Sequence, residues 1–174
     1  MVDSSNKLPI RIGLITVSDR AHEGIRADIS GPALTTEISQ YGWHVVRTVV
    51  LPDEYEQLVN VLTEWVDRGD LDVILTTGGT GFSPRDITPE ATQAVIQRPT
   101  PGLAEAMRNA SLSITPHAML SRATSGIRSQ TLIINLPGSP KGAVENLAVL
   151  APVLPHAIQL LRQDPASEAG HNQI

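Results

Sequence analysis

The chain has 174 residues, a formal net charge of −5 and no cysteine. Its length is typical of one domain, so we expect a single folding unit. The acidic balance argues against a general nucleic-acid binder. Without cysteine, the chain has no disulfide, thiolate metal site or cysteine nucleophile.

Two further features of the composition limit the possible functions. Aromatic residues make up 3% of the chain, so few side chains are present to stack on nucleic-acid bases. No apolar run approaches the roughly 20 residues that span a bilayer, and residues 1–9 show no hydrophobic signal region. We therefore expect a cytoplasmic protein that binds neither nucleic acid nor membranes.

The amino-terminal part of the chain predicts alternating strands and helices. Residues 10–17 are nearly continuous in apolar, β-branched side chains, which is typical of a strand buried on both faces. Residues 30–42 open on Ser-Gly-Pro, a capped helix start, and residues 43–51 form a second Val-rich strand. Apolar side chains then recur at spacings of three and four over residues 55–66, which predicts an amphipathic helix with Asp53 as its side-chain cap.

The carboxyl-terminal part continues the alternation. Residues 71–77 predict a third buried strand, which leads into the loop Gly-Gly-Thr-Gly and a helix opened by Thr88-Pro89-Glu90. A fourth strand is expected over residues 131–136. Three further helices are expected over residues 103–112, 142–150 and 156–162.

This alternation favours a three-layer α/β/α sandwich with a mainly parallel central sheet. We expect one domain over residues 8–163, with flexible termini at residues 1–7 and 164–174. Ligands of open α/β sheets bind outside the carboxyl ends of the strands. The loops at Ser18, Pro52, Gly78 and Pro137 should therefore converge on one edge.

The segment Thr76–Glu90 is the strongest candidate for a binding site. Three glycines in four positions allow backbone N–H groups to approach a phosphate, and the following helix adds its own amino-terminal donors. The competing interpretation is a plain connecting turn. The loop has neither the Walker A nor the Rossmann glycine pattern, so a nucleotide would bind in another way.

Two carboxylates at the expected edge could hold Mg²⁺ against phosphate oxygens. Asp86 lies in the glycine segment and Asp53 follows a strand. Spacing alone favours Asp53 as an ordinary helix cap and leaves Asp86 open to a simple turn role. The turn Ser18-Asp19-Arg20 is equally consistent with ligand binding and with plain solvation.

Further candidates lie later in the chain. Arg122 and Lys141 are possible counter-charges for phosphate, although surface cations usually bind nothing specific. Gly138 offers a point of close backbone approach. The five histidines lack zinc-site spacing and no Gly-x-Ser-x-Gly elbow is present, so neither a zinc site nor a serine hydrolase is indicated.

The chain resembles the MogA and gephyrin G-domain family of molybdopterin adenylyltransferases from Arg11 to Leu161. The stretches that carry the resemblance are Leu14–Arg20, Pro52–Glu54, Thr76–Glu90, Thr100–Gly102, Ile114–Arg122 and Leu132–Lys141. It implies a homotrimer whose subunits bind molybdopterin and ATP and require Mg²⁺. The implied reaction is in-line attack by the terminal phosphate of molybdopterin on the α-phosphorus of ATP, releasing pyrophosphate.

The resemblance also assigns residues. Asp53 and Asp86 match the family's essential acidic pair, which reverses the preference for Asp53 as a mere cap. The implied contacts to nucleotide and pterin are Ser18, Asp19, Thr76, Gly78, Gly79, Thr80, Gly81, Ser121, Arg122, Asn135, Pro137, Gly138 and Lys141.

Three alternatives stay open at the level of sequence. A gephyrin-like scaffold would bind molybdopterin without adenylylation, a MoaB relative shares the glycine loop, and a CinA-like hydrolase shares the fold. No domain for molybdenum insertion is recognisable in this sequence, so a separate insertion protein is the expected downstream partner.

Overall fold

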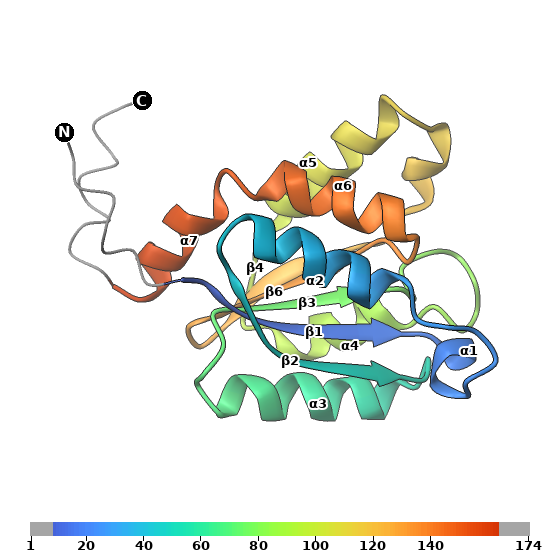
Figure 1. Ribbon diagram of the computed structural model, residues 1–174, viewed down its shortest axis with the longest axis horizontal. Helices are drawn as coiled ribbons and strands as arrows, with labels where there is room; N and C mark the ends of the chain where they lie inside the picture. The colour runs from blue at the N-terminus through green and yellow to red at the C-terminus, as the bar shows by residue number, and fades with distance from the viewer. Residues whose placement is uncertain (1–8, 164–174) are drawn as a thin grey trace.

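Figure 1 shows the computed structural model, which describes residues 9–163 as a six-stranded sheet between two layers of helices. The strand order is β2-β1-β3-β6-β5-β4, and the first four strands run parallel while β5 and β4 pair antiparallel. The strands are β1 (Arg11–Val17), β2 (His44–Leu51), β3 (Val73–Thr77), β4 (Arg98–Pro99), β5 (Ser125–Arg128) and β6 (Thr131–Leu136). The expected three-layer fold with a mainly parallel sheet is confirmed.

The helices divide between the two faces of the sheet. They are α1 (Asp19–His22), α2 (Ser30–Gln40), α3 (Tyr55–Asp67), α4 (Thr88–Val95), α5 (Pro101–Leu112), the 3₁₀ helix η1 (Pro116–Leu120), α6 (Pro140–Leu150) and α7 (Leu154–Leu161). One core contains the buried side chains of α2, α5, α6 and α7, and the other contains those of α3 and α4. The sheet is therefore covered on both faces.

The continuous apolar runs supply both cores because successive strand side chains point to opposite faces. In β1, Ile12 and Leu14 enter the core under α2 and α6, whereas Ile15 and Val17 enter the core under α3. All four side chains are almost fully buried. The two-sided burial predicted for this strand is confirmed.

The predicted N-caps of α2 and α3, Ser30 and Asp53, are both wrong. Ser30 is the first residue of α2 rather than its cap, and its hydroxyl donates to the carbonyl of Gly138 at 2.8 Å, while Asp28 accepts from the N–H of Gly31. Asp53 does not cap α3, whose N-cap position is Glu54 without a side-chain hydrogen bond. Both side chains instead form hydrogen bonds with loops at the carboxyl edge of the sheet.

Four elements were not predicted. The turn after β1 contains α1, and η1 follows α5, where only irregular structure was expected. The strands β4 and β5 form an antiparallel edge of two and four residues. Their patterns are too short to be distinguished from loops by periodicity. The flexible termini predicted at residues 1–7 and 164–174 lie outside the described residues.

No single helix within residues 9–163 is long and apolar enough to cross a membrane. The pair α6 and α7 reaches that length and composition together but is bent by 64° at its break.

An ion-pair cluster at the amino-terminal edge of the sheet provides a test of the fold. Asp72 is 2% exposed, and it accepts hydrogen bonds from the guanidinium groups of Arg11 and Arg162 at 2.6 to 3.1 Å. Burial alone would raise the pKa of Asp72, but the hydrogen bonds from both arginines outweigh it, so the pKa lies below its ordinary value. The cluster ties α7 to β1.

We expect Asp72→Asn to lower the free energy of unfolding by about 1–3 kcal/mol at pH 7, because two cations lose a buried charged acceptor. A carboxylate with a lowered pKa stabilises the fold above its unfolded pKa of about 3.9, and this stability is lost as pH falls through the folded pKa. The difference between wild type and variant should therefore be constant from pH 7 to 5 and shrink below pH ~4. Urea unfolding measures it, with the exposed Asp67→Asn as control. A difference that persists unchanged into acid would contradict this role.

Candidate functional site

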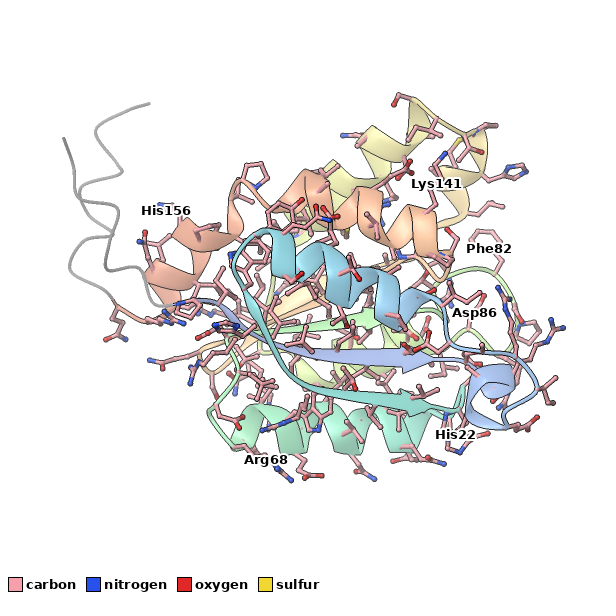
Figure 2. All side chains as sticks on the ribbon, in the orientation of Figure 1. His22, Arg68, Phe82, Asp86, Lys141 and His156 are labelled. Carbon is pink, nitrogen blue, oxygen red and sulfur yellow. The ribbon has the colours of Figure 1, made fainter. Side chains whose placement is uncertain are left out.

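The loops that follow the four parallel strands meet at one edge, as predicted. The N–H of Ser18 donates to the carbonyl of Leu51 at 2.9 Å, which joins the ends of β1 and β2. The N–H of Gly78 reaches the carbonyl of Leu136 at 3.4 Å, which joins the ends of β3 and β6. Figure 1 shows the arrowheads of these strands pointing to this edge, and Figure 2 places Phe82, Asp86 and Lys141 there.

The backbone of the glycine loop, residues 78–81, has an unusual pattern of hydrogen bonds. All four of its carbonyls accept bonds, from the Thr88 hydroxyl and N–H at 2.8 and 3.0 Å and from the Arg122 N–H and Nε at 2.9 and 2.6 Å. By contrast, the N–H groups of residues 79–81 have no hydrogen-bond partner within the described part of the chain. Consecutive unpaired N–H groups are the donors that anion-binding loops present.

Backbone conformation and close packing against β1 explain why position 78 is a glycine. Its φ of +100° is unfavourable for other residues, and an added Cβ would lie 2.2 Å from the carbonyl oxygen of Val17. On the other side, a Cβ at Gly138 would lie 3.2 Å from the Cα of Gly78. The loop after β6 and the end of β1 therefore enclose Gly78.

Asp53 and Asp19 are joined by a reciprocal pair of hydrogen bonds. The N–H of Asp19 donates to Oδ2 of Asp53, and the N–H of Asp53 donates to Oδ1 of Asp19, both at 2.9 Å. Oδ1 of Asp53 lies 3.1 Å from where a Cβ of Gly79 would stand, so this carboxylate rests against the glycine loop. Two loops thus fix its position.

Asp86 approaches the same loop from its carboxyl-terminal side. Its Oδ2 accepts from the N–H of Ser83 at 2.9 Å and lies 2.9 Å from where a Cβ of Gly81 would stand. Burial raises the pKa of Asp53, and repulsion by Asp19 and Asp86 raises it further. The predicted acidic pair is therefore close enough to interact electrostatically.

Arg85 lies between these acidic side chains. Its Nε and Nη2 donate to the two carboxylate oxygens of Asp19 at 3.0 and 2.9 Å, and Nη2 also donates to Glu54 at 2.9 Å. The hydrogen bond from Arg85 lowers the pKa of Asp19, and the bond from the Asp53 N–H lowers it further. In the sequence Arg85 stands out only as the neighbour of Asp86, because nothing in the spacing indicates its partner across 66 positions.

Arg122 holds the glycine loop in place. Besides its bonds to that loop, Nη2 donates to the carbonyl of Asp86 at 2.7 Å, and Nη1 is paired with Glu90. The guanidinium is thus already bound on several sides by protein acceptors. Its predicted contact to phosphate stays a prediction, and its visible function is to orient residues 80, 81 and 86.

Thr76 and Asn135 are fully buried. Their predicted contact to ligand stays a prediction, and the contacts that the structure shows are to other parts of the protein. The Asn135 amide donates to Thr76 at 3.0 Å and to Thr92 at 2.8 Å, and its Oδ1 accepts from the N–H of Thr124. The hydrogen bond between Asn135 and Thr76 joins the ends of β6 and β3.

A largely apolar cleft of about 410 Å³ opens beside the glycine loop, between α5, η1 and the start of α6. The predicted residues that line it are Thr80, Gly81, Ser121, Pro137 and Lys141. Lining residues that were not predicted include Met107, Arg108, Ile114, His117, Leu120 and Asn146. Most come from helix faces, where an apolar pattern does not distinguish a cleft wall from a core.

A second, more polar pocket of about 150 Å³ lies on the other side of the loop. Ser18, Gly78 and Gly138 line it, together with Asp28, which was not predicted as a site residue. Asp28 accepts from the Thr16 hydroxyl at 2.8 Å. Some predicted residues therefore line one or the other of the two pockets, whereas Asp53 and Asp86 line neither of them.

Lys141 is the most exposed of the predicted cations. Its side chain is 80% exposed, and Nζ lies 3.6 Å from Glu145 on the next turn of α6. Such a weakly paired lysine is available to an anion in the cleft. Within residues 9–163, no group of three or more His, Asp or Glu side chains has the arrangement of a metal site made by protein alone.

Comparison with known proteins places this site in context. Residues 13–156 match the family model described as "Probable molybdopterin binding domain". Gephyrin of Dictyostelium discoideum is 48% identical over 166 residues, which are 90% of this chain and 23% of gephyrin. The molybdopterin adenylyltransferase of Helicobacter pylori strain 26695 is 42% identical over 154 residues, which are 87% of this chain and 88% of that protein. The chain thus spans most of the bacterial relative but about a quarter of gephyrin.

A solved structure of a molybdopterin biosynthesis enzyme is also similar to this chain in fold and sequence. The crystal structure of the molybdopterin biosynthesis enzyme MoaB from Thermus thermophilus has a TM-score of 0.84 and 48% sequence identity to this chain. The match covers 90% of this chain and 98% of that one. The two proteins are therefore similar in both fold and sequence over most of this chain.

Proposed function

This chain belongs to the molybdopterin-binding domain family, and from that membership we propose that it is a molybdopterin adenylyltransferase. In this reaction an oxygen of the terminal phosphate of molybdopterin bonds to the α-phosphorus of ATP. The bond from that phosphorus to the bridging oxygen of pyrophosphate breaks, and pyrophosphate leaves with the electron pair. The observation that carries the proposal is the glycine loop, whose carbonyls are bound by protein and whose N–H groups at residues 79–81 face no acceptor within the described residues.

The loop performs the first task, which is to hold phosphate groups. The unpaired N–H groups of residues 79–81 are directed by the fixed carbonyls, because Thr88 and Arg122 prevent the peptide planes from turning. Donors fixed before the substrate arrives need no reorganisation during the reaction. The loop thereby aligns the α-phosphate for in-line attack.

The acidic pair performs the second task. Asp53 and Asp86 flank the loop, each with a carboxylate oxygen that accepts no hydrogen bond within residues 9–163. Two carboxylates together with phosphate oxygens and water suit Mg²⁺, which prefers few protein ligands and hard oxygen donors. Mg²⁺ held there would neutralise charge on the phosphates of the two anionic substrates.

The apolar cleft beside Thr80 and Gly81 performs the third task, which is to receive a ring system of the substrates. Its walls are mainly apolar with some polar groups among them, which is the usual character of a small-molecule site. Lys141 and Ser121 are among the lining residues and contribute a positive charge and a hydroxyl.

We expect purified protein incubated with molybdopterin, ATP and Mg²⁺ to form adenylylated molybdopterin, detected by mass spectrometry. Replacing Mg²⁺ by a chelator should abolish product formation, because repulsion between the two anionic substrates is then uncompensated. Product that forms equally well in excess chelator would contradict the metal dependence.

The alternative left open by the sequence is a binding protein without transfer activity. The relatives named molybdopterin adenylyltransferase do not favour it. Such a protein would retain molybdopterin on a filtration column but form no product with ATP. Release of AMP without molybdopterin would instead indicate a hydrolase.

Three further properties stay predictions from the sequence. We propose a homotrimer, a cytoplasmic location and a separate molybdenum-insertion protein as the partner that uses the product. No partner chain is needed for the contacts among the glycine loop, Asp53 and Asp86, since all of them are made within one chain.

A further inference from the structure

Arg85 is the guanidinium that links the two loops carrying the acidic pair. It precedes Asp86 in the glycine segment, and it donates in a fork to both carboxylate oxygens of Asp19. Asp19 in turn exchanges two hydrogen bonds with Asp53. An unbroken path of short contacts therefore runs from the backbone beside Asp86 to the carboxylate of Asp53.

We propose that Arg85 is a positioning residue for Asp53, which it orients through Asp19. The fork fixes the Asp19 carboxylate in one plane, so Oδ1 stands where the N–H of Asp53 reaches it. Nη2 of Arg85 also donates to Glu54, the residue that follows Asp53, and so holds the Asp53 loop directly. The Asp53 carboxylate is repelled by those of Asp19 and Asp86, and the positive charge of Arg85 offsets part of this repulsion.

Arg85 serves this purpose without being part of the core. Its side chain is 54% exposed, so its ion pairs contribute little to global stability. Arg68 is a matched control, because it is also 54% exposed and paired with a glutamate, Glu64. Figure 2 shows Arg68 at the end of the molecule opposite to Asp86.

Amide hydrogen exchange tests the proposal without any substrate. In ¹⁵N-labelled protein, Arg85→Ala should speed exchange at the N–H groups of Asp19 and Asp53 by roughly tenfold, because their acceptors lose a fixed orientation. The N–H of Ser18, bonded to the carbonyl of Leu51, should be unchanged and serves as an internal reference. Arg68→Ala should leave all three rates as in wild type.

The conservative variant separates charge from geometry. Lysine keeps the positive charge but has no planar fork, so Arg85→Lys should still show fast exchange at Asp19 and Asp53. Full protection in Arg85→Lys, or wild-type protection in Arg85→Ala, would overturn the positioning role.

Kinetics extend the test and rest on the proposed adenylyl transfer. Arg85→Ala should lower kcat by about tenfold or more, since displacement of a catalytic group by a fraction of an ångström has effects of this size. KM for ATP should stay within about twofold. A large rise in KM would show that Arg85 binds the nucleotide directly and would overturn the proposal.

A double-mutant cycle identifies the route. If Arg85 acts through Asp19, then Arg85→Ala in an Asp19→Asn background should lower kcat by less than about twofold. Additive losses would overturn the route through Asp19. Absence of transfer in wild type would sink the proposed function, whereas the exchange measurement would still decide whether Arg85 positions Asp53.

Discussion

Asp53→Asn and Asp86→Asn are each expected to slow AMP transfer by about 10²–10³-fold while molybdopterin binding persists. The scale is that of losing one fixed electrostatic group at a reacting centre. Asparagine preserves the size of each side chain but removes the negative charge that a divalent cation requires. Both carboxylates lie against the glycine loop, where the phosphates of the substrates would lie.

Two measurements check this expectation together. Single-turnover assays give the rate of AMP transfer, and equilibrium binding of molybdopterin shows whether the site is intact. Asp67→Asn is the control, because Asp67 is 61% exposed and lies at the carboxyl-terminal end of α3, away from the site. Wild-type turnover in either site variant would remove the metal role.

Gly78→Ala should damage stability and activity together. The methyl group would meet the Val17 carbonyl at 2.2 Å, and alanine is disfavoured at a φ of +100°. Strain at such a backbone position costs about 1–3 kcal/mol, and relief of the clash must displace the loop from β1. We expect a loss of about 3 kcal/mol in unfolding free energy and little remaining AMP transfer.

Two other glycines separate the effect of backbone strain from that of the steric clash. Gly24 has a φ of +73° with open space around it, so Gly24→Ala isolates backbone strain and should cost about 1 kcal/mol. Gly102 is free of both constraints and lies at the start of α5, so Gly102→Ala should be neutral or slightly stabilising. If Gly78→Ala were as mild as Gly24→Ala, the close packing of the loop against β1 would be refuted.

The fold was predictable because its parallel strands are buried on both faces. Uninterrupted apolar runs such as residues 10–17 are distinctive, and they determine the helix-covered sheet and its ligand edge. The antiparallel edge was not predictable, since Arg98–Pro99 is too short to show a period. The caps failed for a physical reason: a serine or threonine hydroxyl at a helix start can donate to another loop instead. Ser30 does so to Gly138, and Thr88 to Gly78.

The predicted convergence of the loops at one edge of the sheet is confirmed, whereas the predicted ligand contacts stay predictions. Glycine spacing indicated where a backbone must approach closely. The acidic pair Asp53 and Asp86 came from the family resemblance, because their positions alone favoured a helix cap and a turn. Which polar side chains face inward depends on packing between distant segments. Asn135 is therefore buried against Thr76 and Thr92, although its sequence position is as suggestive as that of Gly138.

The most direct test of the central claim follows the fate of the α-phosphate. Protein is incubated with molybdopterin, Mg²⁺ and ATP labelled at the α-phosphorus. The products are then separated, identified by mass spectrometry and quantified. The proposed function predicts label in adenylylated molybdopterin with one pyrophosphate released per product, and no release when molybdopterin is omitted. Label that stays in ATP while molybdopterin is bound, or that leaves as free AMP, would contradict it.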